Sequence, residues 1–289
     1  MAVDTELQHL VSLFDDQDES VVEVVNRRVI GRGEGVLSEI EVLLGRERDP
    51  EMRRSILERM AYFNTEFKIS ELQQFADSGA HSLFEGGYLI SSLVTVGLDR
   101  EKFRRVFMEN SVNFFGTVTG DDAKSRLAHF NRVFFRDLGY MVDDNFMQKE
   151  KNALLYEVFQ NKSGNPIVLS FIYFLFAQEV GLPIYPMCFP GGFIPVYIEN
   201  EDLVMFINIS RNGELFEKDR LKSIMSDQGL ELTEKDFKVR DEKALCIIYL
   251  ESLYYLYSSQ LNQEMMLTLD RALKCFGDER YLSIEEEDE

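Results

Sequence analysis

Residues 167–177 are the feature that most constrains the fold. Apart from Ser170, every residue of this run is aliphatic or aromatic. Asn165 is a good helix cap, Pro166 suits the first helical turn, and Gly181-Leu182-Pro183 stops the pattern. A helix that is apolar nearly all round must be buried, and this one is roughly half the ~20 residues that cross a bilayer. The run therefore predicts a buried helix at the centre of a domain.

A small antiparallel sheet is predicted directly after this helix. Strand-like runs occupy residues 184–189, 193–198 and 203–209. The short link at residues 199–202 favours a hairpin between the last two, and Asn212-Gly213 marks another tight turn. Pro195 has no N–H to donate, so we expect its strand to be an edge or to bulge there. The fold class is α+β, mostly α.

Helical segments flank this core on both sides. A shift of 31 residues overlays Leu13 on Leu44 and Val25 on Ile56, which suggests stacked HEAT-like helix pairs. Any two amphipathic helix pairs also align passably, so this alternative stays open. Helices at residues 244–261 and 263–276 form a C-terminal helical hairpin resembling a TPR pair. The predicted segments are 1–116 (helical), 117–225 (core), 226–283 (helical pair) and 284–289 (acidic tail).

The charge balance narrows the class of partner. The chain has 31 Lys and Arg against 51 Asp and Glu, a net charge of −20. Such a field repels nucleic acid and anionic membranes and favours a protein or peptide partner with a basic patch. The chain has one local group of arginines, and the acidic residues between them reduce its positive charge. These arginines are Arg27, Arg28, Arg32, Arg46, Arg48, Arg53, Arg54 and Arg59.

Cellular location is inferred from the cysteines and the N-terminus. Cys188, Cys246 and Cys275 are odd in number and far apart, which argues against a disulfide framework or a zinc site. The first residues carry no basic segment ahead of an apolar stretch. We expect a cytoplasmic protein in a reducing compartment.

Residues that carry chemistry are sparse. His9, His81 and His129 lie in segments with helical patterns, and none neighbours a cysteine or paired acid at ligand spacing. We therefore expect no metal and no cofactor. Cys188 lies in the middle of a predicted strand, where packing is the favoured interpretation of a cysteine.

Two motifs in the middle of the chain resemble those of a bacterial family. The first is Gly164-Asn165-Pro166-Ile167-Val168-Leu169-Ser170, and the second ends in Phe189-Pro190-Gly191-Gly192-Phe193. That family joins a transglutaminase-like domain to tetratricopeptide-like helices, and its members are described as regulators of gene expression. The resemblance also takes in residues 13–19 and the C-terminal helix pair. It implies a papain-like core in which a central helix packs on a small antiparallel sheet.

The resemblance implies three catalytic positions, and this chain departs from the catalytic pattern at each. The cysteine position falls on Pro166, the histidine position on Gly192 and the aspartate position on Asn208. The family commonly lacks the cysteine but retains the histidine, which is also missing here. Ser170 lies one turn beyond Pro166, but without a base its hydroxyl is a poor nucleophile.

These observations leave three functional hypotheses. The first is a non-catalytic scaffold with a degenerate cleft formed by Asn165, Pro166, Ser170, Gly192 and Asn208, which binds a protein or peptide. The second is a hydrolase or acyltransferase of altered mechanism acting on amide or isopeptide bonds, with His81 or His129 as the base. The third is DNA contact through the arginines, which conflicts with the net charge. The sequence does not fix the oligomeric state.

Overall fold

A computed structural model describes residues 4–115, 122–143, 149–189, 192–200, 203–227, 231–233, 237–277 and 279–282. The predicted acidic tail at 284–289 and the boundary after residue 116 lie outside the described residues. The chain forms two compact units, Met1–Gln74 and Phe75–Glu289. The four predicted segments stay a prediction. In the structure, the helices of residues 83–111 pack with the later part of the chain. Rings on these helices, such as Phe107, stack on the central helix.

The first unit is helical. Its helices are α1 (Thr5–Val11), α2 (Glu19–Ile30), α3 (Val36–Leu44) and most of α4 (Pro50–Asp77). Asp4 and Asp18 cap α1 and α2 with their side chains, as oxygen-bearing N-cap residues do. One core joins the helices through Leu7, Phe14, Val29, Ile40 and Phe63. α4 runs without a break because no glycine or proline interrupts it after Pro50.

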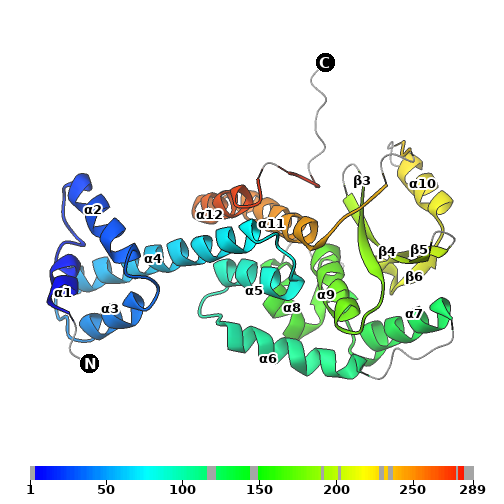
Figure 1. Cartoon of the computed structure of the whole chain (residues 1–289), viewed down its shortest axis with the longest axis horizontal. Coiled ribbons are helices and arrows are strands. Elements are labelled where there is room, and N and C mark those ends of the chain that lie inside the picture. The colour runs from blue at the N-terminus through cyan, green and yellow to red at the C-terminus, as the bar shows by residue number, and fades with distance from the viewer. Residues whose placement is uncertain are drawn as a thin grey trace, which may run out of the picture. The chain divides into compact units, whose positions relative to one another are not determined.

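The second unit combines helices with a small sheet (Figure 1). Its helices are α5 (Leu83–Val94), α6 (Arg100–Ser111), α7 (Ala123–Asn131), α8 (Leu155–Asn161), α9 (Pro166–Glu179), α10 (Lys218–Asp227), α11 (Glu242–Ser259) and α12 (Gln263–Lys274), with 3-10 turns η1 (Val112–Phe114), η4 (Glu150–Asn152) and η5 (Ile209–Arg211) and the π-helix η2 (Arg132–Asp137). Its strands are β1 (Met141–Val142), β2 (Ser163–Gly164), β3 (Ile184–Phe189), β4 (Gly192–Asn200), β5 (Leu203–Asn208), β6 (Glu214–Phe216) and β7 (Lys238–Val239).

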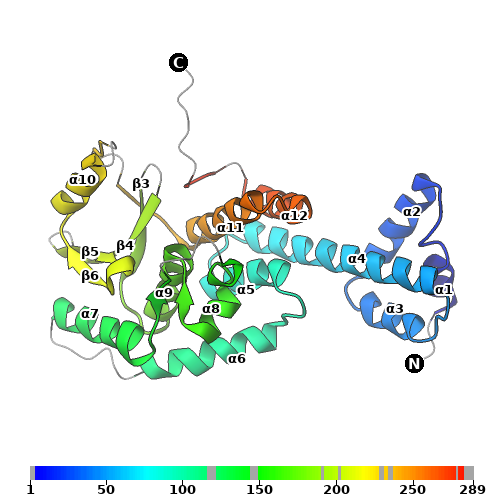
Figure 2. The ribbon, with the colours of Figure 1, turned by 180° about the vertical axis from the view of Figure 1, so that it is seen from behind.

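The predicted antiparallel sheet is confirmed and has five strands among the described residues, in the order β6-β5-β4-β3-β7. Alternate residues point to opposite faces. Met187, Val196 and Phe206 on one face pack against α10. On β4, Tyr197 points to the other face, where Arg126 of α7 donates to its hydroxyl. Figure 2 shows the sheet from behind, with α9 beside β3.

Our expectation for Pro195 was wrong. β4 is an inner strand, and Pro195 pairs with Pro186 of β3 without a bulge. The carbonyl oxygen of Pro186 accepts from the backbone N–H of Arg240 at 2.9 Å, so the polar backbone groups of Pro186 face away from β4. In an antiparallel pair this is a position at which the two residues exchange no hydrogen bonds. Pro186 is therefore not required to donate to β4. Pro195 faces β5 instead, and the pairing of β4 with β5 begins only at the next residue, Val196.

The central helix is α9, as predicted. All side chains from Val168 to Ala177 are buried. Phe176, on the face toward the earlier helices, contacts a group of rings that fixes α9 in the core. These rings are Phe107, Phe114, Phe134, Tyr140 and Phe159. Among the residues that the structure describes, no helix has the length and apolar character needed to cross a membrane.

Candidate functional site

The N-terminus of α9 is held by its capping residue and by a short parallel ladder. Asn165 Oδ1 accepts from the backbone N–H of Val168 at 2.8 Å, and the backbone N–H of Asn165 donates to the carbonyl oxygen of Asn152 at 2.7 Å. Gly164 pairs with Val142 between β2 and β1. A Cβ on Gly164 would lie 2.9 Å from Val158, so this close approach requires glycine. The helix start is therefore well fixed.

Pro166, the predicted cysteine position, and Ser170 lie in the first two turns of α9. Pro166 is the first residue of α9 and has no side-chain donor. The Ser170 hydroxyl donates to the carbonyl oxygen of Pro166 at 2.7 Å, and Ser170 is only 5% exposed. A hydroxyl bound to its own helix in this way has no base to activate it. These two side chains supply no nucleophile.

Gly192 begins β4 and pairs with Phe189 at the end of β3. A Cβ on Gly192 would lie 3.1 Å from the Phe189 ring, so any larger side chain must displace that ring. Pro190 and Gly191 of the motif lie outside the described residues. Gly192, the predicted histidine position, therefore leaves room for an aromatic ring.

Asn208 ends β5 and is half-buried. Its carbonyl oxygen accepts from the backbone N–H of Gly213 at 2.9 Å, which closes the turn through η5 into β6. The predicted turn at Asn212 and Gly213 is confirmed, since both residues have positive φ. Asn208 is the predicted aspartate position, and its amide side chain lacks the charge of an aspartate that would orient an imidazole.

Sequence reasoning missed a hydrogen-bonded pair that fixes this end of the sheet on α9. The Tyr173 hydroxyl on α9 donates to Asn131 Oδ1 on α7 at 2.7 Å. Asn131 Nδ2 in turn donates to the carbonyl oxygen of Gly213 at 2.9 Å. Tyr173 is fully buried. No local sequence signal marks these contacts, because Asn131 is 42 residues from Tyr173 and 82 residues from Gly213.

The structure relates the candidate positions in two ways. Gly192 begins β4 and Asn208 ends β5, and the antiparallel pairing places both at the same end of the two strands. The turn η5, directly after Asn208, packs against α9, the helix that Pro166 begins. The imidazoles are placed separately. His9 lies on α1 in the first unit, His81 is exposed in the loop before α5, and His129 is half-buried on α7.

The thiols of this chain are suited to packing rather than to catalysis. Burial raises the pKa of the Cys188 thiol to about 12, and it also raises the pKa of Cys246 and Cys275. Thiols protonated at neutral pH are weak nucleophiles. Within the described part of the chain, no three His, Cys, Asp or Glu side chains are grouped so that they could hold a metal ion.

A half-buried amine lies at the C-terminal end of α8. Lys162 has left-handed backbone geometry, with φ 61°, and its Nζ contacts Asn110 Oδ1, the Tyr140 hydroxyl and the carbonyl oxygen of Phe159. Nζ also lies 4.8 Å from the centre of the Tyr140 ring. Desolvation lowers the pKa of Lys162 to about 8. This cluster joins α6, α8 and the chain after η2.

A buried carboxylate holds the last described segment of the chain. Glu251 on α11 is 3% exposed, and its Oε2 accepts from the backbone N–H groups of Tyr281 and Leu282 at 3.0 and 3.1 Å. Its Oε1 is buried without a hydrogen-bond partner among the described residues. Burial raises the pKa of Glu251. The contact tethers residues 279–282 to α11.

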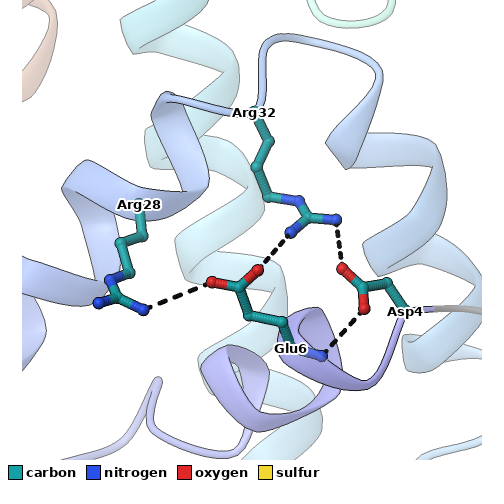
Figure 3. Close-up of polar contacts among 4 residues, drawn as sticks. All are labelled: Asp4, Glu6, Arg28 and Arg32. Carbon is teal, nitrogen blue, oxygen red and sulfur yellow. Dashed lines mark hydrogen bonds and ion pairs between the residues drawn. The ribbon is translucent and has the colours of Figure 1, made fainter.

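The predicted arginine concentration in the first unit is largely used within that unit. Arg32 bridges Asp4 and Glu6, and Arg28 also reaches Glu6 (Figure 3). The hydrogen bond from Arg32 is the main reason why the pKa of Asp4 is lowered. Arg53 and Arg59 donate to backbone carbonyl oxygens. These arginines serve folding contacts, which leaves less positive charge for a nucleic-acid backbone.

Comparison with known proteins defines the class. A family model of the transglutaminase-like superfamily matches residues 101–251, just over half of the chain, a range that contains α9 and β3 to β5. The chain belongs to the transglutaminase-like superfamily.

Individual relatives are similar over shorter segments. A UPF0162 protein of Xylella fastidiosa (strain Temecula1) is 29% identical over 97 residues, which cover 34% of either chain. A UPF0162 protein of Haemophilus influenzae is 34% identical over 77 residues, or 27% of this chain and 28% of the relative. The match therefore spans about a third of the length of these curated relatives. No solved structure matches the chain.

Proposed function

We propose that this chain is a non-catalytic transglutaminase-like scaffold that binds a protein or peptide partner. The proposal rests on the residues found at the three positions that the family resemblance predicts to be catalytic, which are Pro166, Gly192 and Asn208. Proline cannot attack a carbonyl carbon, glycine cannot move a proton, and asparagine has no imidazole to orient. A superfamily fold does not by itself supply an activity.

The local geometry supports the absence of acyl chemistry. The Ser170 hydroxyl is bound to the carbonyl oxygen of Pro166, so this hydroxyl is already a donor within α9. The native thiols have raised pKa values because they are buried. In this proposal Asn165, Pro166, Ser170, Gly192 and Asn208 line a degenerate cleft that binds without reacting.

Helical surfaces extend the proposed binding area. The α1–α4 helices are proposed to act as a HEAT-like region and the α11–α12 pair as a TPR-like hairpin, both of which offer extended surfaces to a partner. The net charge of −20 favours a partner with a basic patch. The arginines bound within the first unit argue against DNA as that partner.

The activity part of the proposal is tested with the purified full chain. Peptide amides, isopeptide-linked peptides and a primary-amine acceptor are incubated with the chain, and products are followed by mass spectrometry. We expect no turnover above that of heat-denatured chain. Turnover that survives further purification and is lost in a His129→Ala or His81→Ala variant would instead establish the hydrolase or acyltransferase hypothesis.

The binding part needs a separate experiment. The tagged chain is used to recover partners from lysate at low and high salt, and each candidate is then tested as a purified protein. We expect a direct complex that weakens with salt, because exposed charges are screened. A chain truncated after residue 283 is the matched control for the five acids of residues 285–289. The proposal fails if no purified candidate binds directly at either salt concentration.

A further inference from the structure

A cavity in the second unit lies at the far end of α9 from the proposed degenerate cleft. It has a volume of about 520 Å³, within the range of sites for small organic molecules. Phe174 and Gln178 of α9 line it, and Phe174 is eight residues, or roughly 12 Å along a helix, from Pro166. The cavity therefore does not overlap the family's catalytic positions.

The walls of this cavity are mainly apolar and poor in donors. Buried side chains from four segments of the chain line it: Leu83, Phe174, Leu182, Ile184, Pro186 and Leu245. Pro183 and Pro186 carry no N–H, so part of the backbone wall offers acceptors only. Tyr185, which is 42% exposed, and Val239, which is 46% exposed, connect the cavity to solvent. The cavity therefore suits the apolar part of a ligand that enters from the surface.

One charged side chain in the wall has an unused donor. The backbone N–H of Arg240 donates to the carbonyl oxygen of Pro186. The guanidinium of Arg240 lies 5.5 Å from the centre of the Tyr281 ring. Its Nε is buried and has no hydrogen-bond partner among the described residues. A guanidinium stays charged at all physiological pH values, so an unpaired buried N–H is costly until an acceptor arrives.

Arg240 also lines a second, polar cavity of about 380 Å³, which shares residues 239–241 with the first. The neighbouring carboxylates already accept hydrogen bonds or ion pairs. Asp241 accepts from the backbone N–H of Ala244, Glu242 from Gln178, and Glu279 from Lys243 and Tyr281. A ligand that enters the cavity can supply an acceptor for this N–H.

We propose that the apolar cavity and Arg240 form a binding site for a monocarboxylate with an apolar body. The apolar part fills the chamber between α9, β3 and α11, and the carboxylate accepts from the Arg240 guanidinium, a charge-assisted contact of the strong kind. The acids at 241, 242 and 279 would repel a dianion such as a phosphate monoester more than a single carboxylate. The site is independent of the proposed scaffold function.

The same carboxylate chemistry has two sources, a free organic acid and the C-terminus of a peptide. Isothermal titration of the full chain with octanoate and octanamide, and with N-acetyl-Ala-Ala-Leu as acid and as amide, separates them. We expect at least one acid to bind about tenfold more tightly than its amide, and octyl phosphate to bind more weakly than octanoate. If octanoate binds and the peptide acid does not, the ligand is a free organic acid. If the peptide acid binds and octanoate does not, the ligand is the C-terminus of a peptide. Acids that bind no more tightly than their amides, or do not bind, overturn the proposal.

Variants tie the binding to Arg240. Arg240→Met, which keeps the apolar stem, should weaken binding of the acid about tenfold and leave the amide unchanged. Arg280→Met is the matched control because Arg280 lies in the same segment and donates to the exposed backbone carbonyl oxygens of Gly277 and Glu279. Unchanged acid binding by Arg240→Met would overturn the proposal. If that variant does not fold, the comparison of acid with amide on the native chain still decides.

A fluorescence reporter locates the site. The chain contains no tryptophan, so Tyr185→Trp places a unique indole on the rim of the cavity. We expect the emission to shift when the acid binds, with the affinity found by titration. Heat of binding without any change in emission would place the ligand elsewhere and overturn the assignment to this cavity.

Discussion

The buried phenol of Tyr173 on α9 donates a 2.7 Å hydrogen bond to Asn131 on α7, which itself donates to the carbonyl oxygen of Gly213. One amide side chain thus ties the central helix to the turn between β5 and β6. Gly213 leaves it the space, since a Cβ there would lie 2.5 Å from the Asn131 side chain.

Loss of this amide should cost more than loss of the phenol hydroxyl. Asn131→Ala leaves the Tyr173 hydroxyl buried without an acceptor, for which we expect about 2 kcal/mol of lost unfolding free energy. Tyr173→Phe leaves only the half-buried Asn131 oxygen, which water can reach, so about 1 kcal/mol is expected. Urea unfolding of both variants and of the double variant measures the pair. Equal costs for the two single variants would contradict this account.

A cysteine placed at the start of α9 tests whether the proposed cleft is open. In Pro166→Cys the thiol would lie at a helix N-terminus, where the dipole favours a thiolate. We expect alkylation by iodoacetamide at neutral pH to be about tenfold faster than for any of the native thiols. Mass spectrometry of peptides gives the site.

Ser170→Cys is the matched control for this experiment. Ser170 is one turn further along α9 and 5% exposed, so its replacement should react slowly. If Pro166→Cys reacts no faster than Ser170→Cys, the helix start is sealed and the proposed cleft does not exist.

The Lys162 cluster predicts a specific pH dependence of stability. The folded-state pKa of Lys162 is about 8, below the value of 10.5 for a free lysine. Between these values the unfolded chain binds more protons than the folded chain, so the contribution of Lys162 to stability rises with pH. Because the amine is half-buried and solvent screens it, we expect a gain of only about 1 kcal/mol between pH 7.5 and 9.5.

Lys162→Met removes this titration. The difference in unfolding free energy between the native chain and the variant, measured by urea unfolding across this pH range, should therefore grow in favour of the native chain. The comparison cancels other groups that titrate in both proteins. A difference independent of pH would show that the amine titrates normally.

Glu251 should control how firmly the last described segment is held. Glu251→Ala removes the acceptor for the N–H groups of Tyr281 and Leu282, and hydrogen exchange at both amides should then speed up more than tenfold. Glu251→Gln keeps one carbonyl oxygen and should retain most of the protection. Glu279→Gln is the control, because Glu279 contacts the Tyr281 hydroxyl rather than the backbone. Unchanged exchange in Glu251→Ala would show that other contacts hold the segment.

Local signals predicted the core of the fold well. α9 was found because its cap, its first-turn proline and its apolar surface all agree, and β3 was placed at its observed limits. The family resemblance then indicated Pro166, Gly192 and Asn208, whose assignment to the catalytic positions stays a prediction. No such signal marks Asn131, Glu251 or Arg240, whose roles depend on partners distant in sequence. The expectation for Pro195 was wrong because the sequence does not show that the pairing of β4 with β5 begins only at Val196.

The two prolines paired across β3 and β4 have a consequence for alignment of the sheet. If β3 slid by one residue against β4, Pro186 would have to turn its polar backbone groups toward β4, where a donor is needed and its ring nitrogen has none. The slipped arrangement would lose a hydrogen bond in the middle of the sheet and expose its buried face. Pro186 and Pro195 thus favour the observed register of β3 against β4, and they penalise misaligned pairing while the sheet assembles.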